Sequence, residues 1–517
     1  AGVRFHHQQG ASGRRYMVEI AGGGVVVFDY DDDGRPDLYF VNGAPLPGDH
    51  DPWKGNALFR NLGDGRFADV TQPAKLQGSG YGMGGAAADA DNDGDIDLLV
   101  TSFGRNLFFK NNGDGTFTDA TDASGIDDET WSASAAFSDL DRDGFVDLYV
   151  TNYLDFTLET HRECVSPQRE IPSYCHPQEY DGVMDRVYRN ERNGVFADVT
   201  LSAGAAVSEL GKGLGVVASD YDGDGDADLY VANDTTRNFL FQNQGDGTFH
   251  EVGLEAGVAY NEEGLPEAGM GTDWGDVDRD GLTDLIVTNF DFETNTLYRN
   301  LGSGFFLDAT AASGLGHVSL TELGFGCDLA DFDNDGWLDF VVTNGHILDN
   351  IAELQANLTF AQPAQFFRNE GGRFREESEH TGEALSRPRV GRGLATLDFD
   401  GDGDLDLVLS NNGGAAELLE NEGGNRNPSL SLRLLGTISN RDGIGARVRG
   451  EGVLEELRAG SSYLSQNELV IHLGLGDATD VRGLVLRWPS GAEYDLPTLD
   501  AGRRYVVKEG AGVIGKY

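Results

Sequence analysis

The sequence predicts an all-β protein: a seven-bladed β-propeller over residues 1–424 and a small β-sandwich or barrel domain over residues 425–517. An acidic nonapeptide of pattern D-x-D-x-D-G-x-x-D occurs seven times in the first region, and a short β-rich run follows each copy. The second region lacks the pattern. Because a unit of four short strands cannot bury both faces alone, the units are expected to stack into a closed ring. An open array of hairpins is the alternative, but its ends would expose sheet edges.

Composition limits the classes of function. Of the 517 residues, 39% are hydrophobic, which supports a packed core. The 87 Asp and Glu residues against 38 Lys and Arg residues give a net charge of −49, which argues against nucleic-acid binding and against charge-driven adhesion to anionic membranes. No apolar stretch approaches about 18 residues, so no membrane span is predicted. The chain begins AGVRFHHQQG, as a processed or trimmed chain would.

Each unit is expected to contain four antiparallel strands. An apolar run rich in Gly and Ala precedes the acidic loop, as in 82–90 (GMGGAAADA), and a β-rich run follows it, as in 97–103 (DLLVTSF). A second hairpin follows, as in 106–121 (NLFFKNNGDGTFTDAT), where Asp-Gly marks the turn. The 73 glycines against 14 prolines also favour many tight turns.

The seventh unit predicts that the N-terminus closes the ring. This unit has a third strand at 417–421, after which no fourth strand is recognised. Residues 4–13 align with residues 116–125, the fourth strand and exit of another unit. We therefore expect residues 3–8 to complete the last blade. A frayed N-terminus is the alternative.

Each nonapeptide has the donor set of a calcium site. Asp at positions 1, 3 and 5 places three carboxylates on one loop, Gly at position 6 permits a sharp turn, position 7 offers a backbone carbonyl, and Asp at position 9 closes the shell. The set matches the first half of an EF-hand loop, and its crowded carboxylates favour Ca²⁺ over Mg²⁺. No His or Cys lies in the loops, which argues against zinc or copper. The alternative is that acidic turn residues merely solvate a hairpin.

The predicted metal ligands are the residues at positions 1, 3, 5, 7 and 9 of the seven loops. They are Asp29, Asp31, Asp33, Arg35, Asp37, Asp89, Asp91, Asp93, Asp95, Asp97, Asp139, Asp141, Asp143, Phe145, Asp147, Asp220, Asp222, Asp224, Asp226, Asp228, Asp276, Asp278, Asp280, Leu282, Asp284, Asp331, Asp333, Asp335, Trp337, Asp339, Asp398, Asp400, Asp402, Asp404 and Asp406. We expect about seven structural Ca²⁺ ions, with folding coupled to their binding because the unneutralised carboxylates of each loop repel one another.

These loops resemble the FG-GAP/VCBS repeats of integrin α-subunit propellers, whose metal roles carry over to each loop position. The tail is similar to an ASPIC/UnbV domain at 436–448 (GTISNRDGIGARV), 460–466 (GSSYLSQ), 472–476 (HLGLG) and 488–491 (WPSG). A propeller followed by this tail resembles the cartilage acidic protein-like family over nearly the whole chain. The resemblance implies a calcium-binding protein that is secreted, periplasmic or on the cell surface, and it leaves the activity undefined.

The positions of the three cysteines predict which of them form a disulfide and which stays a free thiol. A long insertion at 155–184 contains Cys164 and Cys175, which in an exported protein are expected to form a disulfide; two free thiols are the alternative. Cys327 lies in a predicted inner strand and is expected to be a small buried residue.

The sequence also predicts the environments of one tryptophan and three histidine side chains. His346, in an irregular loop, is expected to be a satisfied structural histidine, with ligand or metal binding as the alternative. Trp488 is expected at a packed strand end, with sugar binding as the alternative. His6 and His7 are expected to face opposite sides of the closing strand.

The sequence contains no recognisable catalytic motif. Lys212, Asp273, Asp328 and Arg392 are predicted near the central channel, where structural ion pairs are favoured over an acid–base set. The channel itself is predicted to be mostly apolar. Its predicted lining is Gly23, Met83, Ala133, Leu214, Met270, Phe325 and Arg392.

We therefore expect an exported, calcium-stabilised propeller that acts in binding or adhesion toward protein or glycan partners, as a monomer. One alternative is an enzyme, carbohydrate-active or cyclising a small molecule, with a polar funnel mouth near Asp234, Arg237, Glu293 and Arg392. The other is a structural spacer in a surface assembly.

Overall fold

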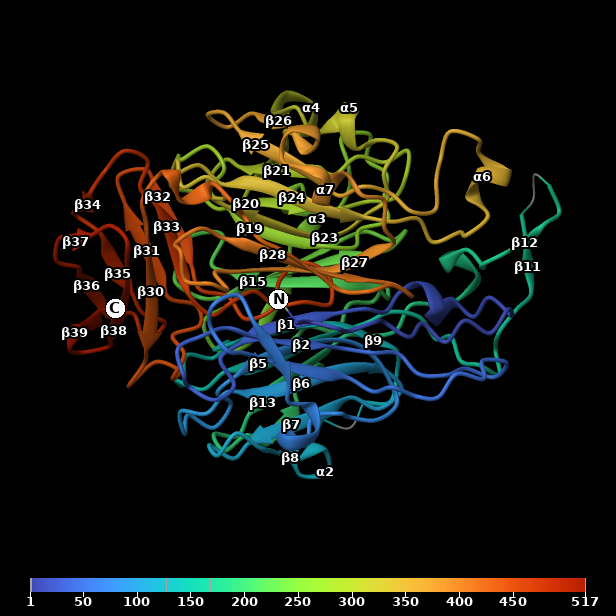
Figure 1. The fold of residues 1–517 in the computed structure, drawn as a ribbon, viewed down its shortest axis with the longest axis horizontal. Helices are drawn as coiled ribbons and strands as arrows, with labels where there is room; N and C mark the ends of the chain where they lie inside the picture. The colour runs from blue at the N-terminus through green and yellow to red at the C-terminus, as the bar shows by residue number, and fades with distance from the viewer. Residues whose placement is uncertain (1, 127, 167–168, 517) are drawn as a thin grey trace.

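The computed structural model describes residues 2–126, 128–166 and 169–516 (Figure 1). It is all-β, as predicted, and small antiparallel sheets follow one another along the propeller region. Six of these sheets have four strands and the last has three. In every one of them, the acidic loop joins the first strand to the second.

The strands of the seven sheets have the following bounds. They are β1 (Val25–Phe28), β2 (Asp37–Phe40), β3 (Ala57–Asn61) and β4 (Phe67–Asp69); β5 (Tyr81–Ala88), β6 (Asp97–Phe103), β7 (Leu107–Asn111) and β8 (Phe117–Asp119); β9 (Ser132–Ser138), β10 (Asp147–Asn152), β13 (Arg186–Asn190) and β14 (Phe196–Asp198); β15 (Gly213–Ser219), β16 (Asp228–Asn233), β17 (Phe239–Asn243) and β18 (Phe249–Glu251); β19 (Thr272–Gly275), β20 (Asp284–Val287), β21 (Thr296–Asn300) and β22 (Phe306–Asp308); β23 (Gly324–Ala330), β24 (Asp339–Asn344), β25 (Gln365–Asn369) and β26 (Phe374–Glu376); and β27 (Gly391–Leu397), β28 (Asp406–Asn411) and β29 (Glu417–Leu419).

The helices are short connections between or beside these sheets. They are η1 (Met17–Ile20), α1 (Thr71–Ala74), α2 (Thr121–Ser124), η2 (Pro177–Glu179), α3 (Gly253–Ala256), α4 (Thr310–Ser313), α5 (Gly316–Ser319), α6 (Ile351–Leu354), η3 (Ser378–His380), α7 (Glu383–Ser386) and η4 (Gly424–Arg426). The insertion in the third unit forms the two-stranded sheet of β11 (Cys164–Val165) and β12 (Pro172–Ser173).

Burial decreases from the inner strand of a sheet to its outer strand. Every residue of β5 is buried, and β6 is buried except at its last residue. In β8, only the first residue is buried. An inner strand is covered on both faces by neighbouring sheets, so its sequence is a continuous apolar run, whereas the outer strand faces solvent.

The sheets are arranged as a ring. The inner strands contact one another in the cyclic order β1, β5, β9, β15, β19, β23, β27 and back to β1. The N-terminal segment lies beside the seventh sheet, where the Ala416 N–H donates to Phe5 O at 3.1 Å and the His7 N–H donates to Gly414 O at 2.8 Å. This is the position in which the N-terminus was expected to close the ring. His6 and Ala415 form an isolated β-bridge there, but residues 3–8 are not assigned as the expected fourth strand. His7 is buried and His6 is exposed, so the two side chains face opposite sides as expected.

An asparagine at or just after the end of each third strand links neighbouring sheets, and it is buried in every sheet except the seventh. Its backbone N–H donates to the position-9 aspartate of its own loop, as Asn300 does to Asp284 Oδ1 at 2.8 Å. Its side-chain Nδ2 donates to the position-2 carbonyl of the preceding loop, as Asn300 does to Tyr221 O at 2.9 Å. Asn61 of the first sheet completes the cycle by donating to Phe399 O in the seventh loop at 2.7 Å.

We call this cycle of hydrogen bonds the asparagine relay. Its members are Asn61, Asn111, Asn190, Asn243, Asn300, Asn369 and Asn421. The sequence contains a repeated signal for the relay, because a short motif such as Phe-Arg-Asn or Tyr-Arg-Asn ends most third strands. The role of that motif was not predicted.

The C-terminal region is a β-sandwich, one of the two forms that were predicted. Its two four-stranded sheets share one hydrophobic core, and β30 and β38 pair in parallel. Trp488 is 1% exposed within this core, so its ring is not accessible for sugar binding. The strands are β30 (Ser429–Leu435), β31 (Arg447–Gly450), β32 (Val453–Glu456), β33 (Ile471–Gly474), β34 (Asp480–Val481), β35 (Val485–Arg487), β36 (Glu493–Asp495), β37 (Leu499–Asp500), β38 (Arg503–Lys508) and β39 (Gly512–Lys516).

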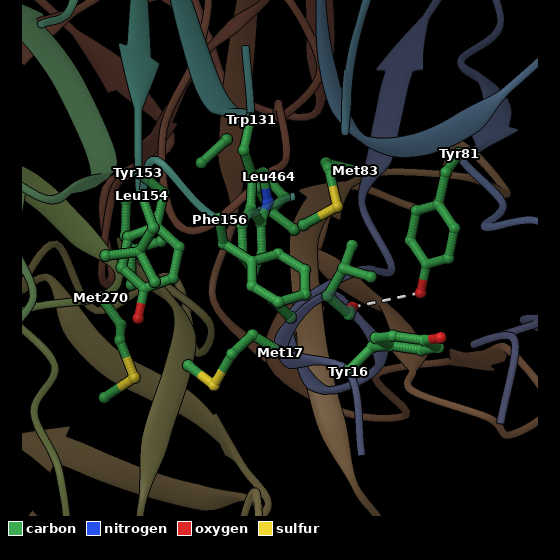
Figure 2. Close-up of a cluster of buried hydrophobic side chains, with 14 of the residues drawn as sticks. Tyr16, Met17, Tyr81, Met83, Trp131, Tyr153, Leu154, Phe156, Met270 and Leu464 are labelled. Carbon is green, nitrogen blue, oxygen red and sulfur yellow. Dashed lines mark hydrogen bonds between the residues drawn. The ribbon is translucent and has the colours of Figure 1, made fainter. Parts of the chain in front are cut away.

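A segment of the C-terminal region fills the propeller channel. We call residues 459–466 the plug. Leu464 N–H donates to Ser134 Oγ at 3.0 Å, and Tyr463 OH donates to Ala21 O at 2.8 Å. Both plug residues are fully buried, and Figure 2 shows Leu464 between channel side chains. The predicted apolar channel is therefore present, and the C-terminal region fills it, which was not predicted.

The plug packs against side chains that the sequence placed in the channel. One hydrophobic cluster contains the two plug residues together with five predicted channel residues. The five are Met83, Ala133, Leu214, Met270 and Phe325. Because the plug also exchanges backbone hydrogen bonds with Thr272, the C-terminal region is an integral part of the propeller core.

Replacing a relay asparagine should weaken the ring. Asn300→Ala removes two side-chain hydrogen bonds and leaves the buried carbonyls of Tyr221 and Thr283 without these donors. We expect the free energy of unfolding to fall by about 1–3 kcal/mol, measured by urea denaturation. The control is Asn357→Ala at an exposed position. Equal stability of the two variants would show that the relay contributes nothing.

Candidate functional site

Acidic side chains converge in the loops between the first and second strands. Seven groups of at least three potential metal-ligating side chains have ligand atoms within 4.8 Å of one another, and five of them, named next, are sets of three loop aspartates able to hold a metal ion. The groups are Asp29, Asp31 and Asp33; Asp89, Asp91 and Asp93; Asp139, Asp141 and Asp147; Asp220, Asp222 and Asp228; and Asp276, Asp278 and Asp284.

The loops share a hydrogen-bond pattern that presents these carboxylates. In the first loop, Asp29 accepts the N–H groups of Asp33 at 3.0 Å and Gly34 at 2.8 Å. The Arg35 N–H donates to Asp33 Oδ1 at 3.1 Å, and the corresponding bond from position 7 to position 5 occurs in all seven loops. Asp37 joins the loop to the third strand by accepting the N–H of the relay asparagine. The carboxylates are thus positioned by the loop backbone.

Many of these carboxylates have an oxygen that is buried and without a hydrogen-bond partner among the described residues. Such atoms occur in six of the seven loops, at Asp31 Oδ1, Asp91 Oδ1, Asp220 Oδ1, Asp278 Oδ1, Asp339 Oδ2 and Asp404 Oδ1. A buried carboxylate oxygen without a donor is costly, and a hard cation removes that cost by accepting the oxygen as a ligand. The donor set and its unsatisfied atoms therefore fit a divalent cation.

The loop backbone is left-handed at two positions. Gly at position 6 was predicted to provide the turn, and Gly34 has φ 84°. Position 4 also has positive φ in every loop, which was not predicted. Asp, Asn, Gly or Arg occupies that position, and the first three adopt this conformation most readily.

Basic side chains from the third strands contact several of the loops. Arg60 Nε lies 2.7 Å from Asp31 Oδ2, and Lys110 contacts Asp91. Arg299 contacts the position-3 Asp278 in the same way. These half-buried cations approach the carboxylates where a metal ion would bind. Each offers a single positive charge and no vacant coordination position, so it replaces a coordinated divalent ion only in part.

Burial raises the pKa values of the loop carboxylates. The pKa of Asp29, at position 1, rises to about 6, and that of Asp37, at position 9, rises to about 8. The pKa values of Asp97 and Asp406, both at position 9, also rise to about 8. Burial is the main cause in each case, and repulsion by neighbouring carboxylates adds to it. A bound cation would therefore displace protons from these loops.

The stability of the cation-free protein should depend on pH. Because the pKa of Asp37 rises from 3.8 to about 8 on folding, this group binds more protons in the folded than in the unfolded state between those values. The free energy of unfolding should therefore fall as pH rises through this window. Urea denaturation in a chelator at about pH 5 and about pH 8 measures the effect. Equal or greater stability at the higher pH would contradict the assignment.

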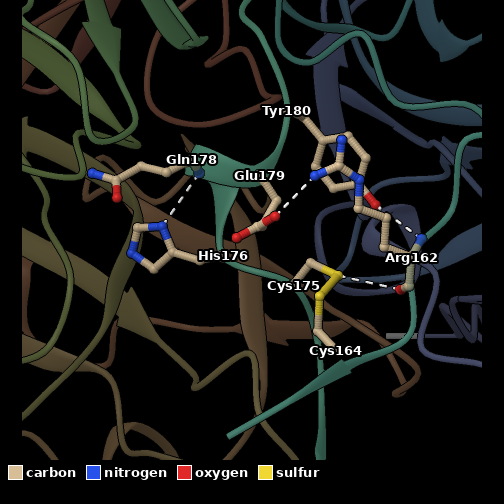
Figure 3. The surroundings of a disulfide bond; sticks show 7 residues. All are labelled: Arg162, Cys164, Cys175, His176, Gln178, Glu179 and Tyr180. Carbon is tan, nitrogen blue, oxygen red and sulfur yellow. Dashed lines mark hydrogen bonds and ion pairs between the residues drawn. A yellow bond between two sulfur atoms is a disulfide. The ribbon is translucent and has the colours of Figure 1, made fainter. Parts of the chain in front are cut away.

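The predicted disulfide is present in the insertion of the third unit. Cys164 and Cys175 are joined with a Cα–Cα distance of 5.1 Å (Figure 3). Arg162 lies beside the bridge and forms an ion pair with Glu179 at 2.8 Å. Cys327 is a buried free thiol, as predicted.

The four residues considered as an acid–base set do not form one cluster. Asp273 and Asp328 interact with each other, and burial together with this contact raises the pKa of Asp328 to about 8, whereas the other two residues make other contacts. Asp273 pairs with Arg458 beside the plug at 3.2 Å. Asp328 accepts hydrogen bonds from Thr396 Oγ1 at 2.7 Å and Asn467 Nδ2 at 2.9 Å. These two aspartates attach the C-terminal region to the ring.

The other two residues of that set bind backbone carbonyls. Lys212 Nζ donates to Pro177 O at 2.8 Å. Arg392 is fully buried, donates to Ile20 O at 2.7 Å, and its guanidinium carbon lies 3.7 Å from the ring centroid of Phe325. Their contacts are those of structural residues.

The residues predicted at a funnel mouth are only partly brought together. Arg237 forms an ion pair with Glu251 at 2.6 Å. Asp234 and Glu293 line one cavity, whereas Arg392 lines a different one.

Among the described residues, none of the helices has the length and apolar character that a membrane-spanning helix requires.

The chain is similar to known proteins in its repeats and in its C-terminal domain. The FG-GAP-like repeat matches residues 29–100, 89–150, 179–231, 220–287 and 276–342, and the ASPIC and UnbV domain matches residues 436–514. Cartilage acidic protein 1 of Homo sapiens is 31% identical over 327 residues, which cover 60% of this chain and 45% of that protein. For the Mus musculus protein, the identity is 31% over 323 residues, with 60% and 46% covered. The chain thus spans less than half the length of these relatives.

Two lectins are among the solved structures with a similar fold. The BP39L lectin from Burkholderia pseudomallei gives a TM-score of 0.46 at 9% identity, over 78% of this chain and 97% of that chain. An Agrocybe aegerita lectin that recognises non-reducing terminal N-acetylglucosamine gives 0.43 at 16% identity, over 77% and 94%. The repeat matches and the sequence relatives confirm the resemblance drawn from the sequence. The chain therefore belongs to the FG-GAP-like repeat family, carries an ASPIC and UnbV domain and is a homologue of cartilage acidic protein 1.

Proposed function

We propose that the chain is an exported, calcium-binding propeller protein that acts in binding or adhesion toward a protein or glycan partner. The observation that carries the proposal is the set of buried carboxylate oxygens without hydrogen-bond partners in the acidic loops. Leaving such charges uncompensated destabilises a fold, and a bound cation reverses that effect.

Calcium is the cation that suits these loops best. Each loop offers four carboxylates and a backbone carbonyl, a crowded oxygen set that Ca²⁺ accepts with its large and flexible coordination shell. Mg²⁺ requires a smaller octahedral shell and retains water. We assign the predicted ligands of all seven loops, from Asp29 to Asp406, to about seven structural ions on this basis.

An extracellular or periplasmic location agrees with two features. The disulfide between Cys164 and Cys175 is of a kind that persists in oxidising compartments. The sequence relatives are named as cartilage proteins. High calcium concentration outside the cell would keep weak sites occupied.

An exposed apolar hairpin favours a protein partner. Leu301, Phe305 and Leu307, in and beside the β21–β22 turn, are 60%, 56% and 57% exposed. Large apolar side chains that gather on one exposed hairpin are typical of protein interaction sites. The plug occupies the centre of the ring, so a macromolecular partner would contact the outer loops.

Calcium content tests the metal assignment. After removal of free metal, elemental analysis should find about seven calcium ions per chain, and a chelator should lower the melting temperature. Asp31→Asn removes one ligand charge and should reduce the content by one ion. The matched control, Asp64→Asn in an exposed turn of the same sheet, should leave it unchanged. Equal calcium content in both variants would contradict the assignment of the first loop.

Partner binding tests the proposed activity. Immobilised protein should capture a component of an extracellular-matrix protein panel or a glycan array with calcium present, and lose it in a chelator. Phe305→Ser should weaken capture of a protein ligand at least tenfold, which corresponds to about 1.4 kcal/mol. Absence of any ligand, combined with turnover in a substrate screen, would refute the binding role.

A further inference from the structure

A cavity of about 690 Å³ opens on the side of the ring away from the C-terminal region. Its rim includes the disulfide hairpin of β11 and β12 and the short helix α6, which project together on that side in Figure 1. Its inner end is formed by Tyr463 of the plug and by channel residues such as Met270 and Phe325. This volume lies within the range of small-molecule sites, about 300–1,000 Å³.

The walls of the cavity are mainly apolar and aromatic. Met17, Leu214 and Met270 contribute aliphatic and thioether surface, and Phe290 and Tyr153 contribute rings. Figure 2 shows Met17, Tyr153 and Met270 directed toward the same space. Such walls suit the body of an apolar organic molecule.

Unsatisfied polar atoms face this apolar space. His346 Nδ1 accepts the N–H of Leu348 at 2.9 Å, so in the neutral ring the proton is on Nε2. That Nε2 lies 3.3 Å from Asp291 Oδ1. Neither atom has a hydrogen-bond partner among the described residues, and the same is true of Thr235 Oγ1. The side chains of His346 and Asp291 are only 1% and 3% exposed. His346 Nδ1 is thus satisfied as expected, whereas Nε2 has only the 3.3 Å contact with Asp291.

Three carboxylates share this part of the cavity. Asp234 accepts a hydrogen bond from Tyr153 OH, and Glu293 accepts the N–H of Ala268 at 2.8 Å. Burial raises the pKa of Asp234 to about 6, and burial followed by repulsion from Asp291 raises that of Glu293. Although Lys212 attracts Asp234 from outside the cavity, no Lys or Arg is among the described residues that line it. The polar end therefore has excess negative charge.

We propose that this cavity binds an apolar small molecule that carries a protonated amine, with the ammonium group among Asp234, Asp291 and Glu293. The ammonium donates to Asp291 Oδ1 and neutralises the repelling carboxylates. The aromatic walls stabilise the cation further through their ring faces. The site is distinct from the acidic loops and does not depend on a macromolecular partner.

Fluorescence titration with dansylcadaverine, an aromatic dye on an aliphatic amine, tests the proposal. The full chain is kept in excess calcium so that the acidic loops are filled. We expect saturable binding with a blue shift of the dye emission. N-acetyl dansylcadaverine has the same body without the charge, and it should bind at least tenfold more weakly. Asp291→Asn should weaken binding of the amine dye at least tenfold and leave the acetylated dye unaffected.

Two further variants keep the test decisive. Glu293→Gln repeats the charge removal if Asp291→Asn does not fold, as judged by its melting transition. Asp495→Asn, on the exposed strand β36, is the matched control and should bind the amine dye as the unmodified protein does. The proposal is overturned if no dye binds, if both dyes bind equally, or if the cavity variants bind the amine dye with unchanged affinity.

Discussion

The aspartate at position 9 of each acidic loop is the residue on which the ring depends. In the fifth sheet, one carboxylate oxygen of Asp284 accepts the N–H of Val277 within the loop, and the other accepts the N–H of Asn300. The side chain of Asn300 then reaches the carbonyl of Tyr221 in the preceding loop. Loop conformation and sheet-to-sheet contact therefore share one carboxylate. Whatever changes the charge of a loop also acts on the contact between neighbouring sheets.

The plug gives the C-terminal region a structural role that its position in the sequence does not reveal. Leu464 and Tyr463 occupy the centre of the ring, where the inner strands would otherwise leave a channel. Asp273 then pairs with Arg458 beside the plug, and Asp328 accepts a hydrogen bond from Asn467. Two carboxyl groups predicted near the channel, where a structural role was favoured over an acid–base role, are thereby engaged in joining two regions. The chemistry left available lies on the opposite side of the ring, around His346.

Basic side chains neutralise the carboxylates of this acidic chain in some places and not in others. Around the loops, strand residues such as Arg60 and Lys110 contact some carboxylates, while other carboxylate oxygens stay without donors. Around the cavity, Asp234 and Glu293 repel each other with no lining Lys or Arg among the described residues. Both places combine burial with excess negative charge. They differ in shape, because the loops offer closely spaced oxygens for an ion and the cavity offers apolar walls for an organic body.

The sequence by itself determined the strands, the turns and the clustering of acidic side chains in the loops, because these follow from apolar runs, turn residues and spacing within one repeat. It also indicated the disulfide pair, from two cysteines within one insertion. It also contained the asparagine motif, but not the identity of its acceptor. Only the tertiary structure decided that Leu464 meets Ser134, 330 residues earlier in the chain, and that His346 Nε2 lies unsatisfied beside Asp291. The reason is physical: local patterns specify backbone conformation, whereas burial and hydrogen-bond satisfaction depend on which distant residues pack together.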